Sequence, residues 1–369
     1  MGVLDLILPA FGRGPSRRIG ALIKRARMSG PKWPSSLLLA LPALLLMSTG
    51  GPSAAEIPLR LALDFKIQGP STPFLLGIDR GYYKAAGLDV TVDPGTSSSD
   101  TISKLAAGNY DMGFADINAL VRFREQSTGT PVKAVFMVYN RAPFAVIARK
   151  SRGILNPSDL EGKKLGAPPT DNSFAEWKIF ARANNIDTSK VTIENVGFPV
   201  REPMLAAAQV DAITGYSFVS YIDVKERGVP IDDLLLLRMA DYGVNAYGNA
   251  VLVNPQFAAA HPDAVKAFLR VLLRSLKETA REPAAAVESA LKRGNNGKKD
   301  VELERLKMAL KDNIVTPEVK ANGYGGVDMA RLDQSIEQMA RVHEFKTKPA
   351  ATDIFDDSFL PPAAERRAN

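Results

Sequence analysis

Short apolar stretches alternate with longer amphipathic ones along the chain from about residue 56 onward. Short runs rich in Val, Ile, Leu and Phe are typical of strands. This rule predicts strands over 59–65, 89–94, 112–116, 132–138 and 144–149. The intervening stretches carry apolar residues at helical spacing and predict helices over 73–84, 98–107 and 118–126. Because each strand is followed by a helix or a turn, the pattern predicts an α/β fold.

A second unit with the same pattern begins near Ser151. Its predicted elements are a capped helical turn and a strand within 156–168, a helix over 171–186, strands over 191–198 and 212–216, and a helix over 201–208. From Pro262 onward the pattern predicts mostly helix, over 263–282, 283–293, 301–312 and 328–342. The stretch before Pro262 is expected to return to the first unit, so the second unit interrupts the first.

This order predicts two lobes joined by two hinge crossings, near residues 139–145 and 242–251. The expected division is a leader over 1–55, the first part of lobe 1 over 56–142, lobe 2 over 143–245, and a return to lobe 1 with C-terminal helices over 246–369. Clefts between domains are common ligand sites, and loops at the carboxyl ends of strands supply the contacts. A cleft between the lobes is therefore the expected binding site.

The N-terminal segment has the pattern of an export signal. Basic residues precede the apolar run Leu37 to Met47, and small residues follow it. This run is too short to cross a bilayer, which needs about 20 helical residues. Ser53 and Ala55 fit positions −3 and −1 of a cut before Glu56. The start codon (Met1 or Met28) and the choice between ordinary and twin-arginine export stay open.

Composition narrows the function further. Of the 47 basic and 40 acidic residues, seven basic residues and one acid lie within residues 1–55, so the rest of the chain is close to neutral and gives no case for a nucleic-acid partner. The chain contains no cysteine, which excludes disulfides, thiol catalysis, cysteine metal sites and a lipoprotein anchor. We expect a free periplasmic protein, without a metal or a cofactor.

Two polar strand-to-helix turns are candidate ligand cradles. The first contains Thr96, Ser97 and Ser98, and hydroxyls with free backbone N–H groups at a helix start suit an anion or carboxylate. Simple capping by one Ser or by Asp100 is the alternative. The second cradle, which we expect to be the equivalent turn of lobe 2, contains Thr170, Asn172 and Ser173. Asp171 in this turn would oppose a bare anion or would cap the helix.

The remaining candidates lie near other predicted strand ends and hinges. Asp64, Phe65, Lys66 and Gln68 follow the first strand, and Asp116 and Asn118 follow the third. Lys66 could pair with a carboxylate or sulfonate, or could be a solvated surface lysine. Capping is the alternative for Asp116. Aromatic side chains suit a pocket but are also common in cores. The aromatic candidates are Phe65, Phe74, Tyr139, Phe198, Tyr216, Tyr242 and Tyr247, of which we expect about three to line the site.

Four stretches, in order, resemble one family. They are "PFLLGIDRGYYKAAGLDVTV" (73–92), "KLAAGNYDMGFAD" (104–116), "NPSDLEGKKLGAP" (156–168) and "EPMLAAAQVDAITGY" (202–216). They are similar to elements of the periplasmic substrate-binding proteins of the nitrate, sulfonate, taurine and thiamine-pyrimidine-precursor type, which serve ABC importers. In the last stretch Gln209 and Val210 stand where the family often has a glycine turn. The resemblance extends from about Leu59 to Ala340.

The resemblance implies the type II periplasmic-binding-protein fold, with a mixed sheet flanked by helices in each lobe and two hinge crossings. It also implies a monomer that captures a small molecule by hinge closure and delivers it to an ABC permease and ATPase. Lys66 and the hydroxyls favour a carboxylate or sulfonate, whereas Asp64, Asp116 and Asp171 favour a heterocycle or amine. The first-lobe loops contain no arginine, which argues against nitrate-like anions.

Two other functions fit the resemblance. One branch of this fold makes the thiamine pyrimidine, using a histidine, a lysine for pyridoxal and a cysteine-rich iron motif. The absence of cysteine and the distant positions of His261 and His343 disfavour such an enzyme. A periplasmic sensing module would bind its ligand in the same way as a transporter component, and the sequence does not separate these two roles.

Overall fold

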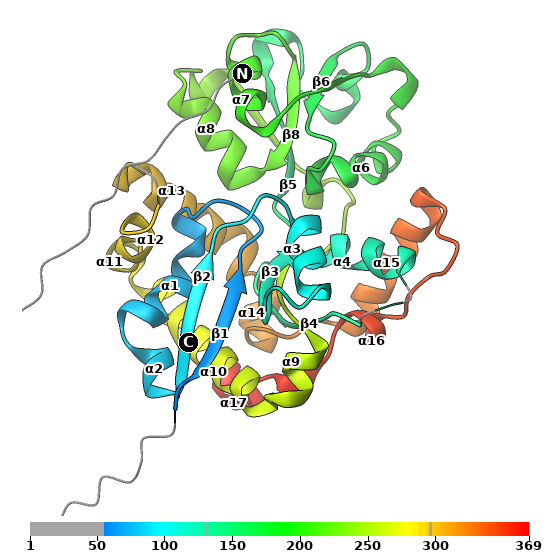
Figure 1. Ribbon diagram of the computed structural model, residues 1–369. Helices are drawn as coiled ribbons and strands as arrows, with labels where there is room; N and C mark the ends of the chain where they lie inside the picture. The colour runs from blue at the N-terminus through cyan, green and yellow to red at the C-terminus, as the bar shows by residue number, and fades with distance from the viewer. Residues whose placement is uncertain (1–54, 128, 130, 295–296, 369) are drawn as a thin grey trace, which may run out of the picture. The chain divides into compact units, whose positions relative to one another are not determined.

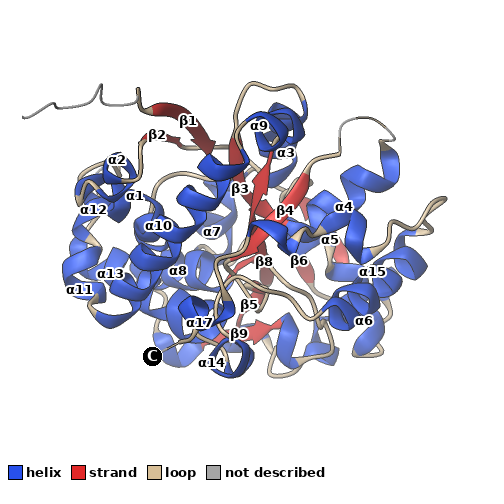
Figure 2. Ribbon diagram, turned by 90° about the horizontal axis from the view of Figure 1, so that it is seen from below, coloured by secondary structure: helices blue, strands red, loops and turns tan. Residues whose placement is uncertain are grey.

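The computed structural model describes residues 55–127, 129, 131–294 and 297–368 (Figure 1). All but the last residue of the predicted leader lies outside the described residues. The described chain forms two mixed sheets with helices packed around them (Figure 2). We refer to the sheets with their helices as lobe 1 and lobe 2. No helix in the described part of the chain is long and apolar enough to cross a membrane.

The sheet of lobe 1 has the order β2-β1-β3-β10-β4. Its strands are β1 (Ile57–Ala62), β2 (Leu88–Asp93), β3 (Met112–Asp116), β4 (Lys133–Met137) and β10 (Asn249–Val253). β1 is parallel to β2 and β3, whereas β10 is antiparallel to β3 and β4. Every residue of β3 and β10 is buried, as expected for central strands covered on both faces.

The sheet of lobe 2 repeats this plan in the order β7-β6-β8-β5-β9. Its strands are β5 (Phe144–Arg149), β6 (Lys164–Ala167), β7 (Thr192–Asn195), β8 (Ala212–Tyr216) and β9 (Leu234–Arg238). β6 is parallel to β7 and β8, and β5 is antiparallel to β8 and β9. The predicted two-lobed fold with a mixed sheet in each lobe is therefore confirmed.

Helices cover both sheets (Figures 1 and 2). Those before β4 are α1 (Thr72–Asp79), α2 (Tyr82–Ala85), α3 (Ser98–Ala106) and α4 (Ile117–Gln126). Those of lobe 2 are α5 (Asn172–Ala175), α6 (Trp177–Ala183), α7 (Phe198–Ala206) and α8 (Ile222–Glu226). After β10 follow α9 (Pro255–Ala260), α10 (Pro262–Arg281), α11 (Pro283–Ala286), α12 (Glu288–Leu291), α13 (Lys299–Ala309), α14 (Pro317–Asn322), α15 (Met329–His343), α16 (Ala351–Ile354) and α17 (Ala363–Arg366).

Several predicted boundaries differ from the structure for local reasons. The helix predicted over 73–84 is broken into α1 and α2 because Gly81 takes a left-handed conformation, with φ of 68°. The strand predicted over 191–198 ends at Asn195, because Pro199 occupies the first turn of α7 and α7 begins at Phe198. The first strand ends at Ala62, so residues 63–68 form a loop instead of extending the sheet.

The described chain passes between the lobes in two segments. Residues 138–143 connect β4 to β5, and residues 239–248 connect β9 to β10. We call them the hinge segments. They overlap the stretches 139–145 and 242–251, where the alternation of elements predicts crossings, and the second segment begins three residues before its predicted stretch.

Candidate functional site

A cavity lies between the lobes, with an empty volume of about 710 Å³ including its open mouth. We call it the interlobe cavity. Loops that follow β1 and β2 form one wall, and loops that follow β6, β7 and β8 form the other. The mouths of α/β strands are common ligand sites. Of the predicted site residues, the lining contains Asp64, Phe65, Lys66, Gln68, Thr96, Ser97, Ser98, Tyr139, Thr170, Asn172, Phe198 and Tyr216.

Six of the candidate residues lie outside this lining. Phe74 is in the core of lobe 1, with its ring centroid 4.9 Å from that of Phe114. Asp116 caps α4 and Asn118 donates to the carbonyl of Tyr247, so both are buried behind the wall. Ser173 is buried in α5, and Tyr242 packs against Phe180. Tyr247 is also buried away from the cavity. These side chains cap a helix, contact a hinge segment or fill the core.

Five polar side chains form a closed ring of hydrogen bonds in the cavity wall. Asp64 Oδ2 accepts from Ser98 Oγ at 2.8 Å and from Asn249 Nδ2 at 2.7 Å. Asn172 Nδ2 donates to Ser98 Oγ at 2.9 Å and to Tyr216 Oη at 2.8 Å. Tyr216 Oη donates to Asn249 Oδ1 at 2.9 Å and closes the ring. We call these residues the polar ring.

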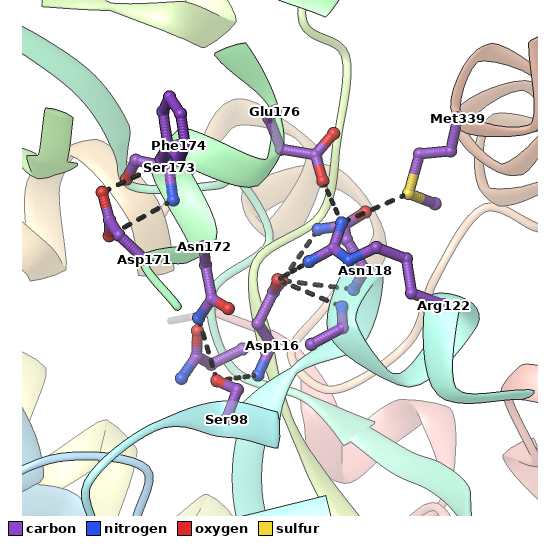
Figure 3. Close-up of polar contacts among 12 residues, drawn as sticks. Ser98, Asp116, Asn118, Arg122, Asp171, Asn172, Ser173, Phe174, Glu176 and Met339 are labelled. Atoms are coloured by element: carbon purple, nitrogen blue, oxygen red, sulfur yellow. Dashed lines mark hydrogen bonds and ion pairs between the residues drawn. The ribbon is translucent and has the colours of Figure 1, made fainter. Parts of the chain in front are cut away.

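The polar ring connects the two lobes. Asp64, Ser98 and Asn249 belong to lobe 1, whereas Asn172 and Tyr216 belong to lobe 2. Figure 3 shows Asn172 directed at Ser98. Because the ring exists only when the lobes meet, the structure is a closed arrangement.

A second contact joins the lobes beside the cavity. The carboxylate of Glu176, between α5 and α6, accepts from Arg122 of α4 at 2.5 Å (Figure 3). Arg122 also lies 3.7 Å from Asp116. Glu176 is 1% exposed, and its pKa is raised by burial even though Arg122 opposes the shift. This buried ion pair also belongs to the closed arrangement.

Asp64 is the carboxylate of the lobe 1 wall. Burial raises its pKa to about 6, and the nearby charge of Asp116 acts in the same direction. The hydrogen bonds from Ser98 and Asn249 oppose this shift but come from neutral groups. Lys66, the cation of this wall, is exposed and lies 5.5 Å from the centre of the Phe65 ring. Asp64 therefore presents negative charge to the cavity without an ion-pair partner among the described residues.

The lobe 2 wall carries a paired charge. Arg201 of α7 is 4% exposed, lies 3.7 Å from Asp171 and donates to Glu202 at 2.6 and 2.8 Å. Asp171 also caps α5 and accepts from Thr214 at 2.5 Å. Burial raises the pKa of Asp171, and Arg201 opposes the shift. The prediction missed Arg201, which lies four residues into α7 where a sequence pattern gives no sign of a buried charge.

Aromatic rings form much of the remaining lining. Phe114, Tyr139 and Phe218 make edge-to-face contacts, with centroids 5.2 and 5.6 Å apart, and Tyr216 lies 5.9 Å from Phe218. Phe65 of lobe 1 faces Phe198 of lobe 2 at 5.8 Å. Flat ligands pack well between such rings. The prediction also missed two polar lining residues, Ser71 and Asn249, and five apolar ones: Leu63, Pro70, Phe114, Phe218 and Val219.

The two cradles are not equivalent turns. The Thr170–Asn172 turn follows β6, which occupies the place of β1, so its counterpart is the Asp64 loop. The counterpart of the Thr96–Ser98 turn is residues 196–197, between β7 and α7. Within the first cradle Ser97 caps α3, as the capping alternative proposed, whereas Ser98 belongs to the polar ring. In the second, Asp171 is the cap.

The site combines a carboxylate, amides and hydroxyls with flat apolar walls. Such a lining holds a small molecule by a few directed hydrogen bonds and by ring packing. The described residues contain no group of three or more His, Asp or Glu placed to hold a metal ion. Neither His261 nor His343 lines the cavity.

The fold defines the class of protein. The chain is similar to the alkanesulfonate-binding protein SsuA from Xanthomonas axonopodis pv. citri bound to MOPS, with 14% identity, a TM-score of 0.62, and 82% of this chain and 99% of the other covered. The chain is also similar to the periplasmic aliphatic sulphonate binding protein SsuA from Escherichia coli, with 13% identity and a TM-score of 0.63. This match covers 82% of this chain and 94% of the other. At these identities the likeness establishes the periplasmic-binding-protein fold.

The chain belongs to the NMT1/THI5-like family, whose model matches residues 68–286. It is 25% identical to the riboflavin-binding protein RibY of Chloroflexus aurantiacus, over 73% of this chain and 74% of the relative. It is 25% identical to the formylaminopyrimidine-binding protein of Halalkalibacterium halodurans, over 88% and 96%. It is also 25% identical to the 4-amino-5-hydroxymethyl-2-methylpyrimidine phosphate synthase of Schizosaccharomyces pombe, over 57% and 62%.

Proposed function

We propose that the chain is the solute-binding component of an ABC-type importer, acting as a monomer in the periplasm once its leader is removed. It captures a small polar organic molecule in the interlobe cavity. The polar ring carries this proposal, because both lobes contribute to it and it lines the cavity. A ligand that contacts both lobes shifts the population toward closure, and the closed form is then recognised by the permease.

Among the ligand classes that the sequence leaves open, the cavity favours a flat heterocycle with N–H donors. Asp64 offers a carboxylate without a cationic partner, and six aromatic rings line the walls: Phe65, Phe114, Tyr139, Phe198, Tyr216 and Phe218. Of the two cations in the lining, Arg201 is already paired with Asp171 and Glu202, so a sulfonate would have only the exposed Lys66 as a cationic partner. Two relatives carry names of heterocycle-binding proteins, which supports this choice.

A thermal-unfolding panel tests the ligand class. The protein from Glu56 onward, unfolded and refolded to release any bound compound, is mixed with aminopyrimidines, flavins, alkanesulfonates and aromatic carboxylates. A ligand at 1,000 times its dissociation constant stabilises a protein by about 4 kcal/mol, which raises the melting temperature by several degrees. We expect stabilisation by a heterocycle. Stabilisation by sulfonates alone would overturn the ligand class, and a silent panel would count against a binding protein for these classes.

Two variants test the site. Asn172→Ala removes the amide that connects Ser98 to Tyr216, and we expect it to weaken binding at least tenfold while the protein remains folded. Asn109→Ala is the matched control, because Asn109 is exposed and lies outside the cavity lining. Equal affinity in the two variants would show that the interlobe cavity is not the binding site.

An enzyme on the same scaffold is the competing function, and the pyrimidine phosphate synthase among the relatives favours it. The cavity wall provides no histidine for proton transfer. The two functions differ in what happens to the bound compound. Mass spectrometry after prolonged incubation should recover it unchanged, whereas conversion to a product would establish an enzyme. Stimulation of the cognate ATPase in proteoliposomes would separate transport from sensing.

A further inference from the structure

The hinge segments are held together by a part of the chain that does not line the ligand cavity. Residues 313–331, which include α14, contact residues 140 and 141 of the first hinge segment and residues 246 and 247 of the second. Residues 313–331 also lie beyond the 68–286 range that the family model matches.

The Glu318 carboxylate bridges both hinge segments directly. Its Oε1 accepts from Asn140 Nδ2 at 3.1 Å and from Tyr247 Oη at 2.7 Å. Its Oε2 accepts from Arg331 at 2.7 Å. Asn140 is 3% exposed and Tyr247 is fully buried, whereas the Glu318 side chain is 25% exposed. Moving one hinge segment relative to the other would break at least one of these bonds.

Neighbouring contacts fix each hinge segment to the same part of the chain. On the first, Thr316 Oγ1 donates to Asn140 Oδ1 at 2.6 Å. Asn313 Nδ2 donates to the carbonyl of Arg141, and the backbone N–H of Arg141 donates to the carbonyl of Asn313. On the second, Arg331 donates to the carbonyl of Ala246 at 3.0 Å. Its guanidinium lies 3.9 Å from the centre of the Tyr247 ring.

We propose that Glu318, together with Asn313, Thr316 and Arg331, forms a hinge clamp that stabilises the closed arrangement of the lobes and so tunes affinity without touching the ligand. The clamp is present in a structure whose lobes are joined by the polar ring and by the Arg122–Glu176 pair. A contact that differs between open and closed states changes their ratio by its free-energy difference, and binding affinity changes with it. The affinity part of this proposal rests on the proposed function.

The lobe separation can be measured without any ligand. The chain contains no cysteine, so spin labels can be placed uniquely at Asp89→Cys in lobe 1 and Arg227→Cys in lobe 2, both exposed positions. Pulsed electron–electron double resonance then gives the distribution of distances between the two labels, and so between the lobes. We expect Glu318→Ala to move this distribution away from that of the parent protein and toward longer distances.

Two further variants separate bridging from other roles. Asn140 and Tyr247 donate to the same oxygen of Glu318, so the amide oxygen of Glu318→Gln can accept both bonds while the ion pair with Arg331 is lost. We expect the glutamine variant to keep the parent distribution. Glu337→Ala is the matched control, because this carboxylate on α15 pairs with Arg341 and Lys348 in the same C-terminal region. It should leave the distribution unchanged.

The outcomes distinguish the clamp from the proposed function. A folded Glu318→Ala protein with the parent distance distribution would overturn the clamp, whatever the ligand panel shows. A shifted distribution with a silent panel would support the clamp and count against the proposed function. If a compound from the panel binds the parent protein, we expect at least fivefold weaker binding to Glu318→Ala and no change in Glu337→Ala, in line with typical coupling between distant sites.

Discussion

Lobe 1 and lobe 2 share a strand order but differ in how the aspartate of each cavity wall is paired. In each sheet three parallel strands are followed by an antiparallel one, which is β10 in lobe 1 and β5 in lobe 2. At equivalent loops, Asp64 of lobe 1 is bonded only by neutral donors, whereas Asp171 of lobe 2 lies 3.7 Å from Arg201. The fold is thus repeated while the chemistry is not. We infer that lobe 1 supplies the charge that selects the ligand, and that the Arg201 cluster mainly holds lobe 2 together.

The largest loss of stability is expected when Arg201 is removed from its buried carboxylates. Arg201→Met leaves Asp171 and Glu202 buried without their cation. Removing one partner of a buried ion pair destabilises a protein by about 3–5 kcal/mol. Urea unfolding of the ligand-free protein should show a loss of this size.

Arg152→Met is the matched control for that measurement. Arg152 also pairs with an aspartate of lobe 2, Asp211, but its side chain is 43% exposed. Exposed pairs contribute about 0–1 kcal/mol. Equal losses in the two variants would contradict the view that the Arg201 cluster is a buried structural unit.

The next largest effect is expected at the centre of the polar ring. Ser98→Ala removes the acceptor for the backbone N–H of Asp116 and for Asn172, and a donor to Asp64. Leaving buried polar groups without partners costs about 1–3 kcal/mol. Unfolding measurements should show a loss of about 2 kcal/mol. Ser99→Ala, at the exposed neighbouring position, should change stability little, and an equal loss there would indicate a general defect in α3.

These residues also show which features the sequence could predict. The strands β3, β5 and β8 have the predicted bounds, because continuous apolar runs between polar turns define buried strands. Polar loops after strands gave Asp64, Ser98 and Asn172, and Tyr216 was among the aromatic candidates; these are four members of the polar ring. Asn249 was missed because it opens a strand that joins lobe 1 only after the chain has passed through lobe 2. The sequence could not tell that Ser97 caps α3 while Ser98 belongs to the polar ring, because the two adjacent hydroxyls differ only in the direction in which they point.

A smaller effect, with the opposite sign, is expected at Asp64. Folding raises its pKa from an ordinary value of 3.8 to about 6, so between these values the folded protein binds a proton that the unfolded chain releases. Stability contributed by this group therefore falls as the pH rises from about 4 to 6. Asp64→Asn should stabilise the ligand-free protein by roughly 1–2 kcal/mol at pH 7.5. Ser98 and Asn249 donate to the same oxygen, so an amide oxygen can accept both bonds.

The pH dependence of unfolding checks this prediction. The advantage of Asp64→Asn should shrink as the pH falls below 6 and be nearly gone below about pH 3, where the parent carboxyl is protonated in both the folded and the unfolded state. The same variant should lose affinity for the heterocycle that binds the parent protein. A constant advantage at every pH would mean that the substitution acts through packing, and unchanged affinity would remove Asp64 from ligand recognition.

The smallest effect is expected at Thr96, which belongs to the same hydroxyl cluster as Ser98. Thr96 is exposed, and its hydroxyl donates to Asp100 Oδ2 at 2.9 Å, outside the polar ring. Surface substitutions of this kind usually change stability by no more than about 0.5 kcal/mol. Thr96→Ala should therefore leave unfolding nearly unchanged and weaken ligand binding far less than Ser98→Ala. Equal losses of affinity in the two variants would show that the ligand contacts the outer end of the cradle, and the site would then extend toward the mouth of the cavity beyond the polar ring.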